Sequence, residues 1–188
     1  MLDLLKNRRV AVIIAIIVIL LSTVFGVNRS LGEKAAEVRD LFENGVYDQN
    51  QRYSRRSIAS QLRVRSDASL GLLSISSSHS LLEDEVKTLR SARDQLLTAS
   101  GPGAKYDADE AMGRAFSDLY DKLSTVSDDV DSATRADYYL SQMQGAARVI
   151  ESSGYNEAVR AFDRSVMSVF PINFLKRISF VQDPELFA

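Results

Sequence analysis

The chain has 188 residues, enough for one membrane-spanning helix and one domain of ordinary size. Its 23 basic and 25 acidic residues leave a formal net charge of −2, so no overall field favours nucleic acid as a partner. Cysteine is absent and His79 is the single histidine, which excludes disulfides, thiolate metal sites, cysteine nucleophiles and sites built from several imidazoles.

An uncharged apolar run, residues 10–27, follows a short basic flank over residues 1–9. As a helix rising ~1.5 Å per residue, this run would be roughly 27 Å long, enough to cross the hydrocarbon core of a membrane. We therefore predict a transmembrane helix in contact with membrane lipid, whose members include Val10, Ile14, Ile17, Leu20 and Val27. A cleavable signal peptide is the alternative, but its apolar region would be long and its cleavage pattern, Val24-x-Gly26, is poor.

The basic residues around this helix bear on its orientation. Lys6, Arg8 and Arg9 crowd the N-terminal flank, which favours an N-terminus in the cytoplasm. Arg29 and Lys34 follow the helix closely and weaken this bias. The prediction is a single-pass protein of the cell membrane with its soluble domain outside the cytoplasm.

The rest of the chain shows helical spacing of its apolar residues in four segments. Gly45 with the polar stretch 47–56, then Ser100-Gly101-Pro102-Gly103, then the acidic run 128–131 separate the segments. No stretch alternates as a strand does. We predict an all-α fold, in which the transmembrane helix precedes an elongated antiparallel four-helix bundle over residues 28–170 and an aromatic-rich tail over residues 171–188.

The helical spacing also predicts which side chains face inward. The expected buried residues are Leu31, Ala35, Val38, Phe42, Ile58, Leu62, Leu82, Val86, Leu89, Leu96, Met112, Phe116, Leu119, Leu123, Val126, Tyr139, Met143, Ala146, Ile150, Tyr155, Val159, Phe162, Val166 and Val169. Ser57 is expected to cap the second segment, and the serine-rich stretch 74–80 to kink, fray or break it. Acids at 107–110 and 128–131 are expected to open the third and fourth segments, where the helix dipole favours negative charge.

Two motifs stand near the end of the chain: Tyr155-Asn156-Glu157-Ala158-Val159 and Phe170-Pro171-Ile172-Asn173, followed by Phe180 and Phe187. Over roughly residues 139–188 the chain resembles the LemA family, which typically shows Tyr-Asn-x-x-Val, then Phe-Pro-x-Asn, then a tail with Phe. The family's Arg-Arg-x-Asp-Leu-Ile-Pro-Asn-Leu stretch is missing, and Arg55-Arg56-Ser57-Ile58 stands without its Pro-Asn pair.

The resemblance implies a membrane-anchored, elongated helical bundle whose biochemical activity is not established. The motif residues Tyr155, Asn156, Phe170, Pro171 and Asn173 are expected to be structural, with the tyrosine packed in the helical seam. A ligand role for the Tyr155-Asn156 pair is the alternative.

A basic patch is predicted where no acid occurs from Gln49 to Ser66, and it consists of Arg52, Arg55, Arg56, Arg63 and Arg65. It is a candidate docking surface for an anionic protein, a lipid headgroup or a polyanion. The alternative is a solvated helix face and its entry loop. The tail likewise has two interpretations, contact with the bilayer interface or closure of the end of the bundle.

No residues are predicted to be catalytic, to bind a cofactor or to hold a metal. The acidic runs 83–85 and 128–131 lack the spacing and the glycine of a calcium loop, and His79 among serines lacks an oxyanion turn. The leading hypothesis is a membrane-anchored interaction or scaffold protein of LemA type, without catalytic activity, for protein partners not identified by the sequence. The alternative is a membrane-tethered sensor of a small molecule or signal.

Overall fold

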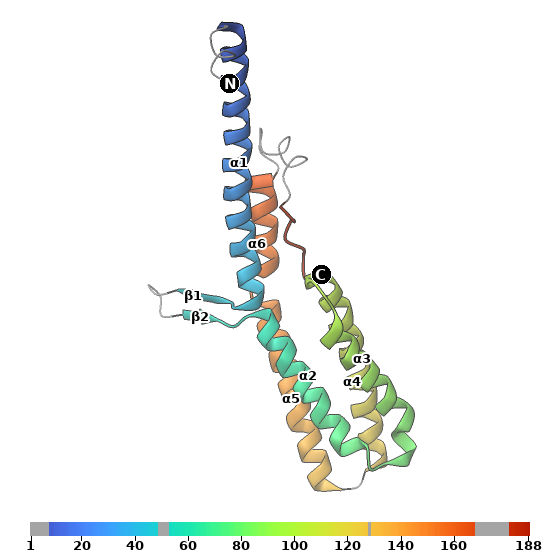
Figure 1. Cartoon of the computed structure of the whole chain (residues 1–188). Coiled ribbons are helices and arrows are strands. Elements are labelled where there is room, and N and C mark those ends of the chain that lie inside the picture. Colours follow the sequence, from blue (N-terminus) through green and yellow to red (C-terminus); the bar gives the residue numbers. More distant parts are fainter. Residues whose placement is uncertain (1–7, 49–52, 128, 168–180) are drawn as a thin grey trace. The chain divides into compact units, whose positions relative to one another are not determined.

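A computed structural model of the chain describes residues 8–48, 53–127, 129–167 and 181–188 (Figure 1). The elements in order are α1 (Arg8–Glu43), β1 (Val46–Asp48), β2 (Tyr53–Arg55), α2 (Ile58–Ser76), the 3₁₀ turn η2 (Ser80–Leu82), α3 (Glu83–Thr98), α4 (Pro102–Val126), α5 (Val130–Glu151), α6 (Tyr155–Phe162) and the π-helical turn η3 (Asp163–Met167). The chain divides into two compact units. Unit 1 comprises residues 1–39 and 158–184, and unit 2 comprises residues 40–157 and 185–188.

In unit 1, the N-terminal part of α1 is long and apolar enough to span a membrane. Ile14 and Ile17 are exposed, Val10 and Val27 are half-buried, and the side chain of Leu20 lies outside the described part. No break separates the predicted transmembrane segment from the helix that follows it, because α1 continues to Glu43.

The second half of α1 buries a stripe of side chains. Leu31, Ala35 and Val38 are buried at the predicted four- and three-residue spacing. Val159 and Phe162 are also buried, and a Cβ built at Gly32 would lie 4.0 Å from Val181 Cγ2. The predicted inward positions Val166 and Val169 lie outside the described side chains.

A β-hairpin follows α1, which corrects the prediction that the chain has no strands. Gly45 has φ 76°, and this left-handed conformation ends α1 as predicted. The three-residue strands β1 and β2 then pair antiparallel, with Val46 opposite Arg55 and Asp48 opposite Tyr53. The strands are too short for alternation of apolar and polar residues to reveal them, so the sequence pattern indicated only a polar connection.

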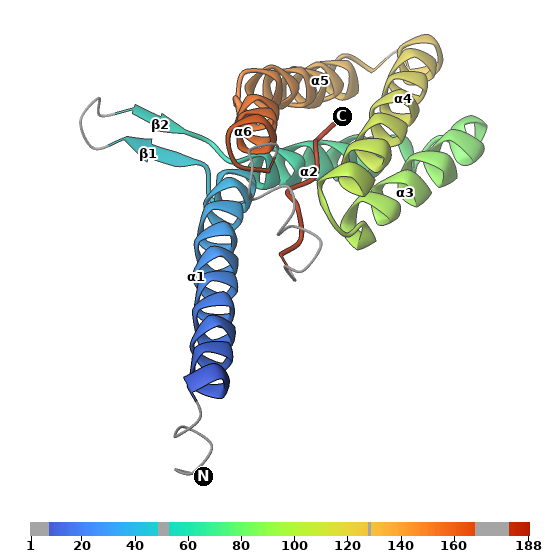
Figure 2. The same cartoon turned by 90° about the horizontal axis from the view of Figure 1, so that it is seen from above.

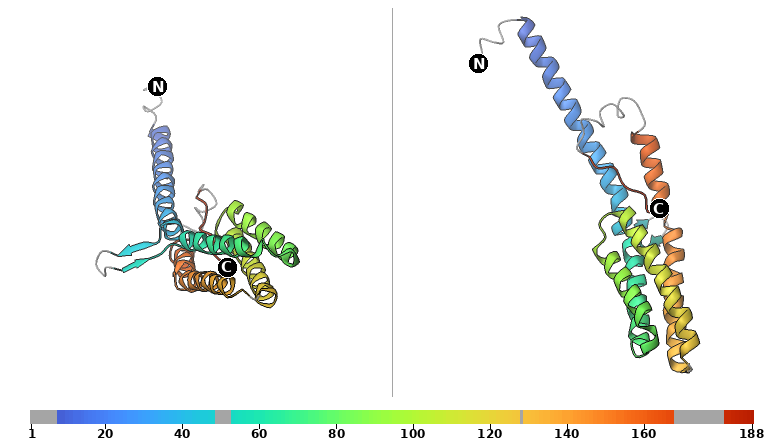
Figure 3. Two further views of the ribbon diagram at one scale, coloured as in Figure 1. Left: turned by 90° about the horizontal axis from the view of Figure 1, so that it is seen from below. Right: turned by 90° about the vertical axis from the view of Figure 1, so that its right-hand side faces the viewer.

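In unit 2, α2 packs against α3, α4 and α5, while α4 also packs against α3 and α5. The largest contacts join α2 to α5 and α3 to α4, as Figure 1 and the view from above in Figure 2 show. The same two pairs are seen from below and from the side in Figure 3. The helices bury an apolar core that includes Ile58, Leu62, Leu72, Leu89, Leu96, Met112, Phe116, Leu119, Leu123, Met143 and Ala146.

The predicted inward faces of unit 2 are confirmed at most positions. Met112, Phe116, Leu119 and Leu123 are buried, whereas Val126 is 37% exposed at the last turn of α4. Tyr139 and Ile150 on α5 are half-buried. One close approach depends on a glycine, because a Cβ built at Gly71 on α2 would lie 2.2 Å from ring atoms of Tyr139.

The serine-rich stretch breaks the second predicted segment into α2 and α3. The hydroxyl groups of Ser77 and Ser78 donate to the carbonyl oxygens of Ser74 and Ile75, and α2 ends at Ser76. Serine hydroxyl groups compete in this way with the continuing helical hydrogen bonds. As a result, the four helices that pack in unit 2 are α2–α5, and they do not coincide with the four segments predicted from the sequence.

The helix starts agree with prediction at two of three places. The Ser57 hydroxyl accepts from the Ser60 N–H at 3.0 Å, and the Asp129 carboxylate accepts from the Ser132 N–H at 3.0 Å. The prediction that acids open the third segment is wrong, because α4 begins earlier, at Pro102, after Gly101 in the left-handed region with φ 83°.

Candidate functional site

The structure removes one residue, Arg65, from the predicted basic patch. Arg56 and Arg63 are exposed, whereas Arg65 is only 7% exposed. Arg55 lies in β2 with its side chain outside the description, and Arg52 lies outside the described residues. Arg65 must therefore be removed from the docking patch, since a buried guanidinium is not accessible to a partner.

Arg65 forms a buried ion pair with Asp109. Its Nε lies 2.6 Å from Asp109 Oδ1, and its Nη1 donates to the Met143 carbonyl oxygen at 3.3 Å. Gly113 makes room for this side chain, because a Cβ there would lie 3.0 Å from Arg65 Nη2. Burial raises the pKa of Asp109, and the neighbouring charge of Arg65 opposes that rise. The pair joins α2, α4 and α5 inside the core.

A sequence signal for this pair existed. Arg65 falls on the buried stripe of α2, between Leu62 and Ser69, and Asp109 falls three residues before Met112 on the buried stripe of α4. A charge of each sign at an inward position predicts a buried pair. The two residues are 44 positions apart, so the local absence of acids around Arg65 concealed the partner.

The motif pair Tyr155 and Asn156 lies against the last described residues of the chain. The Tyr155 hydroxyl donates to the Glu185 carbonyl oxygen at 2.7 Å. The Asn156 side-chain amide donates to the Phe187 carbonyl oxygen at 2.8 Å, and its Oδ1 accepts from the Phe187 N–H at 2.9 Å. Tyr155 is buried, as predicted. The other motif residues, Phe170, Pro171 and Asn173, lie outside the described residues.

Aromatic side chains surround Phe187. Its ring centroid lies 5.3 Å from that of Tyr106 and 5.9 Å from that of Phe42, which in turn lies 5.4 Å from Tyr155. The Lys105 ammonium lies 5.3 Å from the centroid of the Phe42 ring. We call this arrangement the tail-docking site and define it by Phe42, Gly101, Tyr106, Tyr155 and Asn156. Residues 185–188 of the tail therefore pack on unit 2.

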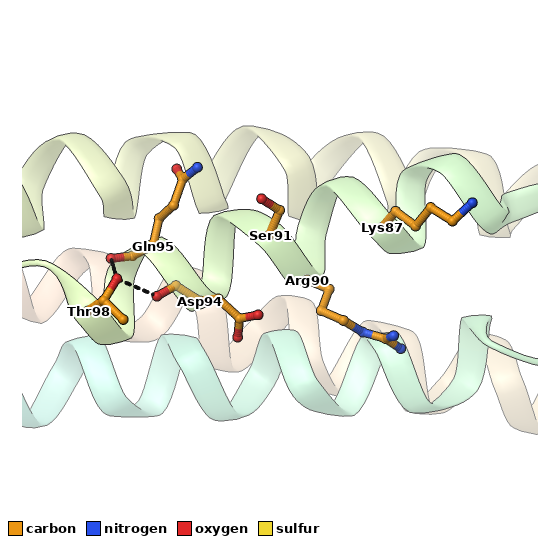
Figure 4. Close-up of a pocket in the computed structure, with 6 residues that line it drawn as sticks. All are labelled: Lys87, Arg90, Ser91, Asp94, Gln95 and Thr98. Atoms are coloured by element: carbon orange, nitrogen blue, oxygen red, sulfur yellow. Dashed lines mark hydrogen bonds between the residues drawn. The ribbon is translucent and has the colours of Figure 1, made fainter.

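Two hollows of unit 2 are relevant to ligand binding. The larger, of about 410 Å³, is lined only by one face of α3 (Figure 4), by Lys87, Arg90, Ser91, Asp94, Gln95 and Thr98. The Thr98 hydroxyl in this hollow is satisfied by its own helix, through the carbonyl oxygens of Asp94 and Gln95. A surface made by one helix face has no walls that could enclose a ligand.

The smaller hollow, of about 210 Å³, joins apolar and charged groups, and its lining residues are Glu43, Ala59, Leu62, Arg63, Ser66, Leu96, Leu97 and Lys105. The Ser66 hydroxyl is buried and has no hydrogen-bond partner among the described residues. We call this hollow the Arg63 groove. Its charged groups are Arg63, Lys105 and Glu43, and Lys105 Nζ lies 3.8 Å from Glu43 Oε1.

The acidic runs are held by ion pairs and caps. Glu83 pairs with Lys87, Glu85 pairs with Lys122, and Asp129 caps α5. Hydrogen bonds from Ser132 lower the pKa of Asp129. Within the described residues, no group of three or more His, Cys, Asp or Glu side chains is arranged to hold a metal ion.

The chain was compared with protein-family models, with curated proteins and with solved structures, and none of them matches. The fold therefore defines the class of the protein only broadly, as a mostly helical protein with one N-terminal helix that is apolar enough to span a membrane. The resemblance to the LemA family stays a prediction from the two sequence motifs.

Proposed function

We propose that the protein is a membrane-anchored interaction or scaffold protein of LemA type that acts without catalysis. Residues 10–27 anchor it in a cell membrane as a single span, and the soluble part lies outside the cytoplasm and binds protein partners. In this proposal α2–α5 form an antiparallel four-helix bundle, and the short links between consecutive helices support that arrangement.

The observation that carries the proposal is the exposure of large apolar side chains on every side of the first half of α1. Ile19, Leu21 and Phe25 are 64%, 65% and 72% exposed. An apolar surface of this extent is stable in lipid and costly in water. The one hydroxyl group there is also compatible with lipid, because Thr23 Oγ1 donates to the Ile19 carbonyl oxygen at 2.8 Å within the helix.

A lysine pair in α1 tests the anchor. Ile14→Lys with Ile17→Lys is expected to move the protein from the membrane fraction to the aqueous fraction, because each lysine costs about 2.5–3.5 kcal/mol at the centre of a spanning helix. Leu81→Lys is the matched control, since Leu81 is 77% exposed in unit 2, and this variant should stay with the membrane. Wild-type protein recovered from the aqueous fraction without detergent would refute the anchor.

A second experiment tests the interaction. Crosslinked pulldown from membranes is repeated with Arg56→Glu and Arg63→Glu, the two patch residues whose side chains are exposed, and with Arg148→Glu as an exposed control outside the patch. Loss of one defined partner with the patch variant alone supports the proposal. If the same partners are recovered with every variant, the basic patch is not part of the proposed interaction surface.

The Arg63 groove favours a second candidate function, a membrane-tethered sensor. An apolar floor with the exposed Arg63 beside it suits a small amphipathic anion, while Lys105 pairs with Glu43 in the same groove. Titration with short-chain carboxylates should raise the melting temperature of the wild type and leave Arg63→Met unchanged. An equal response of both chains would exclude this groove as the sensor site.

A further inference from the structure

The last described residues of the chain lie in the tail-docking site as an extended peptide lies in a binding groove. The residues of the site come from three places in unit 2: the end of α1, the start of α4 and the start of α6. Glu185–Ala188 belongs to no helix or strand. The groove and its occupant are therefore distinct parts of the chain.

The hydrogen bonds of the site are made to main-chain groups of Glu185–Ala188. Asn156 pairs with both the N–H and the C=O of Phe187, and Tyr155 binds the carbonyl oxygen of Glu185. An amide side chain that satisfies both polar groups of one residue does for an extended peptide what a neighbouring strand would do. These bonds fix the position of the peptide, whereas any preference for its sequence must come from side-chain contacts.

Two side chains of the occupant supply the sequence preference. Phe187 is 6% exposed, between the rings of Phe42 and Tyr106. Glu185 comes two residues before Phe187, and its carboxylate lies beside the start of α4. A Cβ built at Gly101 would be 2.8 Å from Glu185 Oε2.

The start of α4 favours a negative charge at this point. No side chain caps this helix, and its first turn holds no acid. The unpaired N–H groups and the dipole of a helix N-terminus attract a carboxylate. The site thus buries an aromatic ring and lies beside an exposed carboxylate two residues earlier, in the spacing Glu-x-Phe.

We propose that the tail-docking site is a peptide-binding groove, filled in cis by Glu185–Ala188, which takes an extended Glu-x-Phe segment of a partner protein in its place. The inference rests on the proposed function, because it names the chemistry of the partner that the interaction domain binds. Among the described contacts, three main-chain hydrogen bonds and the buried ring of Phe187 hold the cis segment, and a competing peptide offers the same groups.

The test measures binding of a labelled peptide to the full chain in detergent. The peptide has the sequence Asp-Pro-Glu-Leu-Phe-Ala of residues 183–188, and fluorescence anisotropy reports binding. Phe187→Ala weakens the cis competitor, so this chain should bind the peptide at least about tenfold more tightly than the wild type does. A peptide with alanine in place of phenylalanine should bind at least about tenfold more weakly.

A second substitution places the binding in the groove. Asn156→Ala in the Phe187→Ala chain should weaken binding by about tenfold, because two main-chain groups lose their partner. Glu157→Ala is the matched control, an exposed neighbour on the same helix, and should leave the affinity unchanged. Absence of saturable binding to a Phe187→Ala chain that melts cooperatively would overturn the inference.

If the Phe187→Ala chain does not fold, the wild-type chain is used with a peptide that carries a photoreactive benzophenone in place of the phenylalanine ring. Crosslinks to Phe42, Tyr106 or Tyr155 are expected, and crosslinks only elsewhere overturn the proposal. A dimer that excess peptide does not disperse would mean exchange of tails between two copies, which also overturns it.

These results are separable from those for the proposed function. If the peptide binds in the groove but the membrane pulldown yields no partner, the groove stands and the interaction role is refuted. If the Asn156→Ala chain still binds the pulldown partner, the interaction role stands and the groove is refuted as its site.

Discussion

The first half of α1 and the core of unit 2 place similar apolar side chains in opposite surroundings. In the first half of α1, the isoleucines and valines from Val12 to Ile19 are exposed, and no charge occurs among them. In unit 2, each helix hides an apolar stripe, and the stripes of α2 and α4 each contribute one residue to a buried charged pair. The distribution of apolar residues around a helix, more than their number, therefore indicates whether the helix faces lipid or protein.

The strongest way to break the comparison is to unpair the buried charge. Arg65→Met leaves the Asp109 carboxylate in the core without its cation, and the free energy of unfolding should fall by about 3–5 kcal/mol. Chemical denaturation of the full chain in detergent, followed by circular dichroism, measures this change. Arg63→Met, two residues away and exposed, is the matched control and should stay within about 0.5 kcal/mol.

A double substitution sharpens the same point. Arg65→Met with Asp109→Leu replaces both charges by apolar groups and should recover most of the lost stability. A double variant as unstable as the single variant would show that the pair is needed for its geometry and not merely for its mutual neutralisation.

The close approach of α2 to α5 gives the next largest effect. Gly71→Ala places a Cβ where the Tyr139 ring now lies, and this overpacking should cost about 1–3 kcal/mol in the free energy of unfolding. Gly145→Ala on α5 is the control, because a Cβ there meets nothing within 4 Å, and it should be neutral or stabilising by about 0.4–1 kcal/mol. Equal melting temperatures for the two variants would contradict the packing described.

The smallest effect is expected at the start of α5. Asp129→Ala removes the cap and should lower the melting temperature by about 2–4 °C at neutral pH. The folded pKa of Asp129 lies below its ordinary value of 3.8, so its contribution is complete above that pH and is lost as the pH falls through the lowered pKa. The two melting curves should converge in strong acid, and a constant difference down to pH 2 would exclude this cap.

Helical periodicity predicted the core well where it ran without interruption. Met112, Phe116, Leu119 and Leu123 follow a strict three- and four-residue spacing, and all four are buried. The apolar run in α1 is equally plain, because length and lack of charge depend on no distant residue.

The sequence failed where the outcome depends on distant partners. Arg65 was assigned to the basic patch because its partner, Asp109, lies on another helix. The hairpin was missed because its strands are too short to show a period of two. Asn156 stood out only through its family motif. Its bonding partner, Phe187, could not be identified before the fold brought the end of the chain to α6.

The tail-docking site also sets an order of events during synthesis. Phe42 emerges early from the ribosome, but the ring that covers it belongs to Phe187 and is translated far later. The apolar part of α1 is made before either ring, so it leaves the ribosome before any residue of the site does. The rings of Phe42 and Tyr106, which Phe187 contacts in the folded chain, therefore lack this partner in the nascent chain until translation reaches the last residues.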